Sequence, residues 1–264
     1  MDGRLPAGEE CGDDAGMKRR AFVMGAGAAM AGERMEVFLL AGQSNMAGRE
    51  VVEEQDRAVI PGVFAFSKER AWAPAVDPIH FDKPIAGAGL GRSFGETLLK
   101  LRPGARIGLV PAAFGGTSLE EWKPGGKLFT DAVERARAAV RDGALRGILW
   151  HQGEAESGEE GRARSYGERW LVMMKAMREE LGAGDVPVVV GELGRFFQGG
   201  KQAYAGVVNE QLALLAVRGR RVAFVASEGL GHKGDSVHFD SAGLRELGRR
   251  YAMAYAELDG EWVR

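Results

Sequence analysis

The stretch Met35-Glu36-Val37-Phe38-Leu39-Leu40-Ala41 leads directly into Gly42-Gln43-Ser44-Asn45-Met46-Ala47-Gly48. The first run is short and apolar, as is typical of a strand buried in a sheet. The second run begins with small residues and a serine, so the Ser44 hydroxyl lies where the strand ends. In α/β sheets this edge is where ligands bind. The junction therefore predicts an α/β fold with a reactive hydroxyl at Ser44.

The rest of the chain repeats this alternation of short apolar runs and longer helical segments. Buried strands are predicted over residues 35–41, 106–111, 147–150, 187–190 and 221–226. Helices are predicted over residues 93–101, 128–141, 163–181, 204–217 and 242–258. Strands and helices that alternate in this way form parallel βαβ units. We therefore expect one α/β domain over residues 34–264, with a doubly wound parallel sheet of about five strands.

A long segment rich in proline and glycine, residues 49–91, separates the first predicted strand from the first predicted helix. Loops of this length are uncommon in compact domains and are usually functional or mobile. We expect this loop to shape the substrate site.

Composition narrows the class of partner. The formal net charge of the 264-residue chain is -2, and its 35 lysines and arginines are scattered along the sequence. A nucleic-acid-binding protein normally carries a basic patch or stripe, so this class is disfavoured. No apolar run reaches the roughly 20 residues that a membrane span needs. The single cysteine, Cys11, allows neither an intramolecular disulfide nor a thiolate metal cluster.

Residues 1–33 are expected to be a poorly ordered leader that contains an export signal. From Met17, the basic run Lys18-Arg19-Arg20 precedes a short apolar stretch, residues 21–30, and Ala29-Met30-Ala31 fits a signal-peptidase site. This arrangement predicts a periplasmic or extracellular protein, and the sequence leaves open whether the leader is cleaved or translation starts at Met17. A cytoplasmic protein with an N-terminal extension is the alternative.

The segment Asp235-Ser236-Val237-His238 places a carboxylate and an imidazole three residues apart. A histidine acting as a general base needs a second group that fixes its tautomer, and a nearby carboxylate does this. With Ser44 as nucleophile, these residues predict a serine hydrolase. Ser44 also fits a simple helix cap, and His232, Asp235 and His238 have the spacing of a metal site. The motif is not the Gly-x-Ser-x-Gly elbow, because position 46 is Met.

Two further segments follow predicted strands and can face the same edge of the sheet. In Trp150-His151-Gln152-Gly153-Glu154 the glycine allows a sharp turn, so that a Gln or His side chain points into the crevice. The alternative is that Gln152 is a turn residue satisfied by the backbone. In Phe114-Gly115-Gly116-Thr117-Ser118 the glycines can offer a backbone N–H to an oxyanion.

Taken in order, these segments resemble the sialate O-acetylesterase and acetylxylan esterase branch of the SGNH (GDSL-like) hydrolases, which contains carbohydrate esterase family six. The matching blocks span about residues 35 to 245. They are residues 42–48, residues 115–118 with Glu121-Trp122, residues 150–154 and residues 235–239. The glycine-rich stretch 86–91, with Phe94, also resembles a segment that this branch carries near its active site.

The resemblance implies a three-layer α/β/α, flavodoxin-like fold and a role for each matched residue. Ser44 would be the nucleophile, His238 the base and Asp235 the acid that orients it. The Ser44 N–H, the Gly116 N–H and the Gln152 side chain would form the oxyanion hole. Further substrate-binding residues would be Gln43, Gly89, Trp122 and Glu154. Most SGNH hydrolases have Asn where this chain has Gln152.

The resemblance further implies ester hydrolysis without a cofactor or metal, with acetyl groups on carbohydrate as substrate. An SGNH hydrolase of another ester, such as a lipase or thioesterase, is one alternative. A catalytically inactive carbohydrate-binding homologue is another, and the presence of Ser44, Asp235 and His238 weighs against it. The sequence indicates neither the sugar, the acetylated position nor the oligomeric state.

Overall fold

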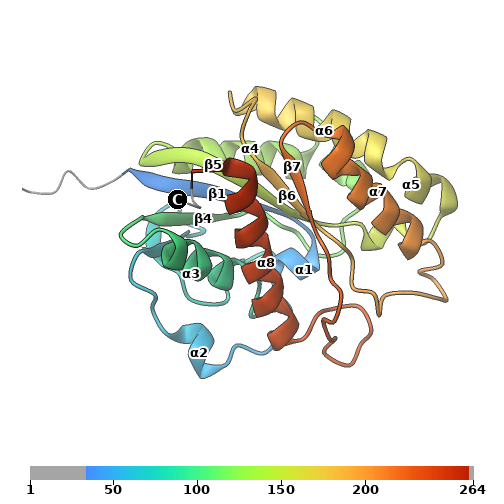
Figure 1. Ribbon diagram of the computed structural model, residues 1–264, viewed down its shortest axis with the longest axis horizontal. Helices are drawn as coiled ribbons and strands as arrows, with labels where there is room; N and C mark the ends of the chain where they lie inside the picture. The colour runs from blue at the N-terminus through green and yellow to red at the C-terminus, as the bar shows by residue number, and fades with distance from the viewer. Residues whose placement is uncertain (1–33, 262–264) are drawn as a thin grey trace, which may run out of the picture. The chain divides into compact units, whose positions relative to one another are not determined.

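The computed structural model describes residues 34–261, which form a three-layer α/β/α domain (Figure 1). Its central sheet has the strand order β3-β2-β4-β1-β5-β6-β7. The three-layer architecture confirms the predicted fold class. The predicted leader, residues 1–33, lies outside the described residues, and its role as an export signal stays a prediction.

The five predicted strands are all present and all parallel to their neighbours. Among themselves they follow the order 2-1-3-4-5, the flavodoxin-like arrangement, and ligands bind where this order reverses. That point is the carboxyl end of β1, beside β5. The strands are β1 (Met35–Gly42), β4 (Ile107–Pro111), β5 (Gly143–His151), β6 (Val188–Gly191) and β7 (Val222–Val225).

The predicted number of strands is wrong, because the sheet in the described part of the chain has seven. The two extra strands, β2 (Val63–Phe66) and β3 (Trp72–Pro74), lie within the segment predicted to be a loop. β2 pairs parallel to β4, and β3 pairs antiparallel to β2 at the edge of the sheet. β2 is a run of only four apolar residues and β3 has only three residues, and both lie within a segment whose prolines and glycines indicate a loop.

Each predicted helix is present, with ends shifted by a few residues. Residues 163–181 are the exception, because two helices meet at Ser165, whose hydroxyl donates to the Gly161 carbonyl. The main helices are α3 (Gly91–Leu101), α4 (Lys127–Ala139), α5 (Glu160–Arg164), α6 (Tyr166–Glu180), α7 (Ala205–Arg218) and α8 (Ser241–Asp259). Short helices occur at α1 (Ser44–Ala47), α2 (Glu54–Arg57), η1 (Leu119–Trp122) and η2 (Glu154–Glu156). None of the helices in this part of the chain has both the length and the apolar character that a membrane span needs.

The sheet separates two apolar cores, and β1 contributes to both because successive side chains point to opposite faces. Phe38 and Leu40 pack with α3 and α8 on one face. Val37 and Leu39 pack with α4, α6 and α7 on the other. Since β1 is buried along its whole length, it holds the residue that follows it rigidly at the sheet edge.

Candidate active site

Ser44 begins the short helix α1 directly after β1. The turn between them passes so close to β5 that a Cβ atom on Gly42 would lie 2.1 Å from the His151 carbonyl oxygen, and Gly42 has a φ of +125°. A glycine is therefore needed at this position. The turn leaves Ser44 at the first position of α1, buried except for 6% of its surface.

Three predicted catalytic residues lie within hydrogen-bond distance of one another. The Oγ atom of Ser44 lies 3.0 Å from Nε2 of His238. On the other side of the ring, Nδ1 of His238 lies 2.7 Å from Oδ2 of Asp235. With Asp235 accepting the Nδ1 proton, Nε2 is free to accept the serine proton. The arrangement is that of a nucleophile, a base and an orienting carboxylate.

Asp235 is held in its charged form. Burial of the carboxylate acts against the charge, but the hydrogen bonds from the His238 backbone, the His238 ring and the Val237 N–H outweigh it and lower the Asp235 pKa to about 2. Oδ1 accepts both backbone N–H groups, at 2.8 and 2.9 Å. The carboxylate is thus a stable negative partner for an imidazolium at any pH well above 2.

The other histidine of this segment, His232, shapes the turn. Nδ1 of His232 accepts the backbone N–H groups of Gly234 and Ser236, at 3.0 and 3.2 Å. This ring nitrogen is therefore already used, which disfavours the metal interpretation of His232, Asp235 and His238. Within residues 34–261 no group of three or more histidine, cysteine, aspartate or glutamate side chains is placed to hold a metal ion.

The glycine loop after β4 lies beside the nucleophile, because the Phe114 N–H donates to the Gly42 carbonyl at 3.0 Å. The Gly115 N–H is taken by Asp82 Oδ2 at 2.9 Å. Gly116 is exposed, has a φ of +79°, and its N–H has no partner among residues 34–261. Of the two glycines, Gly116 is therefore the one with a free donor.

Gln152 lies at the end of β5, wholly buried behind this loop. Its amide nitrogen donates to the Thr117 carbonyl at 3.1 Å. The Tyr166 hydroxyl, 3.0 Å from Oε1, fixes the orientation of the amide group. One amide hydrogen remains for another acceptor. Both interpretations of Gln152, as an oxyanion donor and as a satisfied turn residue, are compatible with this geometry.

A residue not singled out in the sequence, Asn45, connects the nucleophile helix to the histidine loop. Its amide nitrogen donates to Glu154 Oε1 at 2.6 Å and to the Val237 carbonyl at 3.1 Å. Its carbonyl oxygen accepts the Phe239 N–H at 3.1 Å. Asn45 thus holds the chain on both sides of His238. Its position next to Ser44 was the available signal in the sequence.

Glu154 is a buried partner of Asn45. Burial is the main cause that raises the pKa of Glu154, while the hydrogen bond from Asn45 acts in the opposite direction. Its second oxygen, Oε2, has no partner among residues 34–261. The hydrogen bonds of Glu154 connect β5 to the nucleophile helix.

The predicted role of Trp122 in substrate binding is corrected by the structure. Trp122 has no exposed surface and stacks edge-on against Trp150, with ring centroids 5.1 Å apart. Its indole N–H donates to the Thr117 hydroxyl at 3.1 Å. Because its ring is covered and its only polar hydrogen is already donated to Thr117, Trp122 supports the glycine loop from below.

Gln43 and Gly89 lie close to α1 but are also buried. Gln43 accepts two backbone N–H groups of α1 on its carbonyl, and its side-chain Oε1 has no partner in the described part of the chain. A Cβ atom on Gly89 would lie 3.4 Å from the Cα atom of Gly48, so this glycine packs against the end of α1. A direct substrate contact of either residue stays a prediction.

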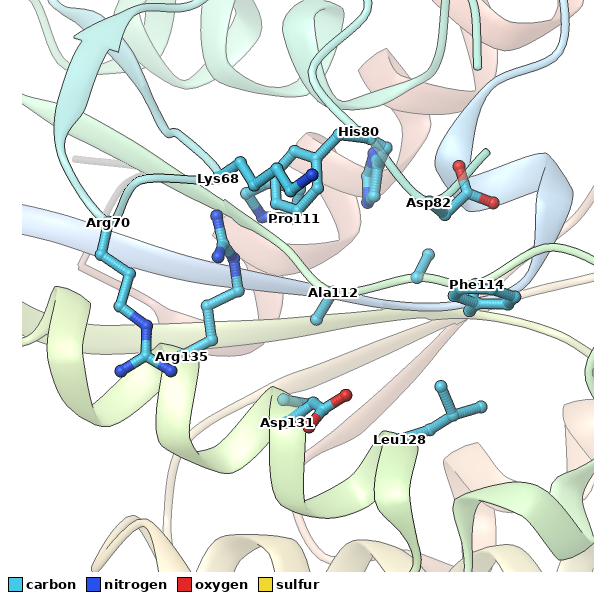
Figure 2. A pocket seen from close by; sticks show the side chains of 13 residues that line it. Lys68, Arg70, His80, Asp82, Pro111, Ala112, Phe114, Leu128, Asp131 and Arg135 are labelled. Carbon is cyan, nitrogen blue, oxygen red and sulfur yellow. The ribbon is translucent and has the colours of Figure 1, made fainter. Parts of the chain in front are cut away.

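A cavity of about 320 Å³ opens beside the glycine loop (Figure 2). Its wall at this end is Phe114, which directly precedes Gly115, and 38% of the Phe114 surface is exposed. Three basic side chains, those of Lys68, Arg70 and Arg135, border the other end (Figure 2). The volume is at the lower end of the range for small-molecule sites.

Comparison with known proteins agrees with this geometry. The family model for carbohydrate esterases described as sialic acid-specific acetylesterase matches residues 34–257. The chain belongs to this family. This chain is 30% identical to a probable carbohydrate esterase of Arabidopsis thaliana. The match extends over 240 residues, which are 83% of this chain and 90% of the plant protein. Membership of the family makes the protein a carboxylic ester hydrolase that acts on acetylated carbohydrate.

Solved structures share the fold of the esterase. The structure of an Arabidopsis thaliana protein superposes with a TM-score of 0.76 and 28% identity, covering 85% of this chain and 98% of that one. NanS gives a TM-score of 0.71 at 17% identity, covering 85% and 97% of the two chains. A carbohydrate acetylesterase from Xanthomonas citri gives 0.63 at 19% identity, covering 86% and 57%. At these lower identities the likeness of the last two concerns the fold alone.

Proposed function

We propose that the protein is a serine O-acetylesterase that removes acetyl groups from carbohydrate through Ser44, His238 and Asp235. The observation that carries the proposal is the continuous contact from Ser44 Oγ through His238 to Asp235, at 3.0 and 2.7 Å. These residues come from opposite ends of the chain and meet at the sheet edge where the strand order reverses. The match to the acetylesterase family model supports the same reaction.

The reaction proceeds in two steps. Ser44 Oγ attacks the acetyl carbonyl carbon while His238 Nε2 takes the serine proton, and Asp235 stabilises the resulting imidazolium. His238 then returns the proton to the sugar oxygen, the C–O bond breaks, and the deacetylated sugar leaves an acetyl group on Ser44. Water attacks this acetyl-enzyme by the same route, which releases acetate and restores the serine hydroxyl.

We assign the oxyanion hole to the N–H groups of Ser44 and Gly116 and to the Gln152 amide. Both backbone groups lack a partner among residues 34–261, and both belong to segments joined by the hydrogen bond from Phe114 to Gly42. Donors fixed before the reaction stabilise the negative oxygen of the tetrahedral intermediate without reorganisation.

The cavity beside Phe114 supports a substrate larger than an acetyl group. Because its lining includes Phe114, two residues before Gly116, we propose that a sugar occupies it while its acetyl ester reaches Ser44. Exposed rings such as Phe114 and Phe81 offer apolar faces to a sugar ring. We propose an acetylated sugar, of the sialic acid or xylan type, as the substrate.

The proposal is tested by acetate release from acetylated xylan, O-acetyl sialic acid and simple acetylated sugars, and by turnover of p-nitrophenyl acetate. Ser44→Ala is expected to lower kcat by several orders of magnitude, because the nucleophile is lost. Its Tm should change little, since Ser44 is the first residue of α1 and not its N-cap, and no side chain caps this helix. Ser165→Ala, which removes a hydroxyl at the junction of α5 and α6, is the matched control and should keep full activity.

A fluorophosphonate reagent provides a direct test of the nucleophile. We expect one covalent adduct on Ser44 in the wild-type protein, located by peptide mass spectrometry, and none in Ser44→Ala. If Ser44→Ala kept more than about a tenth of wild-type turnover, the assignment of the nucleophile would be wrong. Hydrolysis of other esters without any acetate release from carbohydrate would favour the lipase or thioesterase alternative.

A further inference from the structure

A buried ion pair lies directly under the glycine loop, outside the three catalytic residues. Arg49 Nη2 lies 2.5 Å from Asp82 Oδ2, and the two side chains are only 4% and 2% exposed. Figure 2 shows Asp82 close to Phe114, at the end of the cavity that borders this loop. Burying two charges costs hydration energy that their attraction often fails to recover. Stability alone is therefore a weak reason for this pair.

The hydrogen bonds of the pair connect the segments that carry the catalytic groups. Arg49 Nη1 donates to the Gly48 carbonyl at 2.6 Å, at the end of the helix that begins with Ser44. Asp82 Oδ2 accepts the Gly115 N–H at 2.9 Å. From the histidine loop, Lys233 Nζ donates to the Arg49 carbonyl at 2.9 Å. The pair is thus attached to the nucleophile helix, the glycine loop and the histidine loop.

The glycine loop also rests on the pair sterically. A Cβ atom on Gly115 would lie 2.1 Å from Arg49 Nη2 and 3.2 Å from Asp82 Oδ2. The loop backbone therefore packs against both charged groups at a distance that no other residue at position 115 allows. Since Gly116 is the next residue, the direction of its free N–H is set by how the peptide of Gly115 lies on Asp82.

We propose that Arg49 and Asp82 are positioning residues for the oxyanion hole: their ion pair fixes the Gly115–Gly116 backbone relative to Ser44. This inference rests on the proposed esterase function. Oxyanion donors are effective only if they are aligned with the position where the negative charge develops. Displacement of a catalytic group by about 1 Å can lower the rate about 100-fold.

Two substitutions of Asp82 test the proposal, because they remove different parts of its interactions and should lower kcat to different extents. Asp82→Ala removes the acceptor for the Gly115 N–H and the partner of Arg49, so kcat for p-nitrophenyl acetate should fall about 10- to 100-fold, with KM within about twofold. Asp82→Asn keeps a carbonyl acceptor but loses the charge, and its kcat should lie between those of Asp82→Ala and the wild type. Rates are expressed per folded molecule, from active-site titration with a fluorophosphonate and circular dichroism.

Asp56 provides a matched control, because it has the same kinds of partners as Asp82 but lies away from the site. It is 3% exposed, and it accepts two hydrogen bonds from Arg245 and one from the Glu53 N–H. Asp56→Asn and Asp56→Ala should lower the Tm by an amount similar to that of the Asp82 variants. Their kcat should stay within about twofold of the wild type.

Inhibition by a simple alkylboronic acid gives a second readout that a structural role would not change. The boronic acid forms a tetrahedral adduct with the serine, and one of its oxygens occupies the oxyanion hole. The inhibition constant should rise for Asp82→Ala in proportion to its loss of kcat and stay unchanged for Asp56→Ala. The inference is overturned if folded Asp82→Ala matches Asp56→Ala in both kcat and inhibition constant. A wild-type protein without esterase activity would instead overturn the proposed function itself.

Discussion

At the scale of single residues, the site depends on side-chain amides as much as on the three catalytic groups. Asn45 bonds to the chain on both sides of His238, and Gln152 is fixed behind the glycine loop by Tyr166. Amides supply a donor and an acceptor from one rigid group, so they can hold two backbones in register. The bonds of Asn45 keep His238, which lies on a surface turn, at a defined distance from Ser44 on the short helix α1.

We expect Gln152→Ala to lower kcat by about 100- to 1000-fold, the usual effect of removing one oxyanion donor. KM should change little, because the interaction forms chiefly in the transition state. Steady-state kinetics and the Tm should be measured on the same preparation.

Tyr166→Phe is the matched control for this substitution. It removes the hydroxyl that lies within hydrogen-bond distance of the backbone oxygen and of Oε1 of Gln152, but leaves the Gln152 amide in place. Because this hydroxyl orients the amide without replacing it, kcat should fall by less than in Gln152→Ala, and the Tm should fall as well. If Gln152→Ala lost stability alone, with kcat unchanged, Gln152 would be a satisfied turn residue and only the backbone donors would remain.

Ser44, Asp235 and His238 could be proposed from the sequence because their residue types and order fit the chemistry, and their catalytic roles stay a prediction. Arg49 and Asp82 could not, since each is an ordinary charged residue in a long loop and only folding brings them together under Gly115. Trp122 was misinterpreted for the opposite reason. An aromatic residue near a catalytic block fits both a sugar platform and a core residue, and burial decides between them.

At the scale of elements, the turn from His232 to His238 positions the base. The His232 ring accepts two N–H groups within this turn, and the Asp240 carboxylate caps α8 directly after it by accepting the Gly243 N–H at 2.7 Å. The turn is thus fixed at its start by a ring nitrogen and at its end by a helix cap. Between these two points, the hydrogen bonds of Asn45 and the contact of His238 with Ser44 connect it to the nucleophile helix.

His232→Ala should lower kcat by about three- to tenfold, since it loosens the turn without removing a proposed catalytic group. The two hydrogen bonds that the His232 ring accepts each stabilise the turn by about 0.5–1.5 kcal/mol. Activity of the wild-type protein should be unchanged by EDTA. Both are measured with p-nitrophenyl acetate at saturating concentration. Complete loss of activity in His232→Ala, together with inhibition by EDTA and recovery with zinc, would instead support the metal interpretation.

The predicted elements show which signals a sequence carries. The five predicted parallel strands contain continuous apolar runs, although β5 and β7 are only partly buried. β2 was missed because its short apolar run lies within a segment rich in proline and glycine, and β3, which pairs with β2, has only three residues. The break at Ser165 was also missed, because helical spacing continues through it and the bond from its hydroxyl to Gly161 is a local detail.

At the scale of the whole molecule, buried titratable groups link stability to pH in opposite directions. Burial lowers the pKa of His80 to about 4 and that of His151 to about 3. Between pH 4 and about 6.5, the unfolded chain therefore takes up protons on these rings that the folded protein does not, and stability falls as the pH falls.

Burial, together with the charge of Asp56, raises the pKa of Asp77 to about 7. In the folded protein Asp77 thus keeps a proton that the unfolded chain loses near pH 4, so stability falls as the pH rises from 4 to 7.

Asp77→Asn tests whether the buried charge of Asp77 lowers the stability of the folded protein at high pH. The neutral amide removes the cost of a buried charge, so the variant should be more stable than the wild type at pH 8, by at most about 4 kcal/mol for a shift of about three pKa units. At pH 4 the two proteins should differ little, because Asp77 is then protonated. Urea unfolding at pH 4, 6 and 8 measures the difference. An equal gain at pH 4 and pH 8 would show that the charge of Asp77 is not the cause.

The distance in sequence between Ser44 and His238 has a consequence for biosynthesis. The proposed nucleophile lies near the start of the domain and is synthesised first, whereas the proposed base follows it 194 residues later. The base turn is held in place by Asn45 on one side and by the start of α8 on the other, and α8 packs on the same core as β1. A nascent or truncated chain that ends before residue 231 therefore contains an exposed serine without a base. The proposed hydrolysis therefore requires that β1 and α8 have packed into one core, so enzymatic activity would report on molecules in which the two ends of the domain have come together.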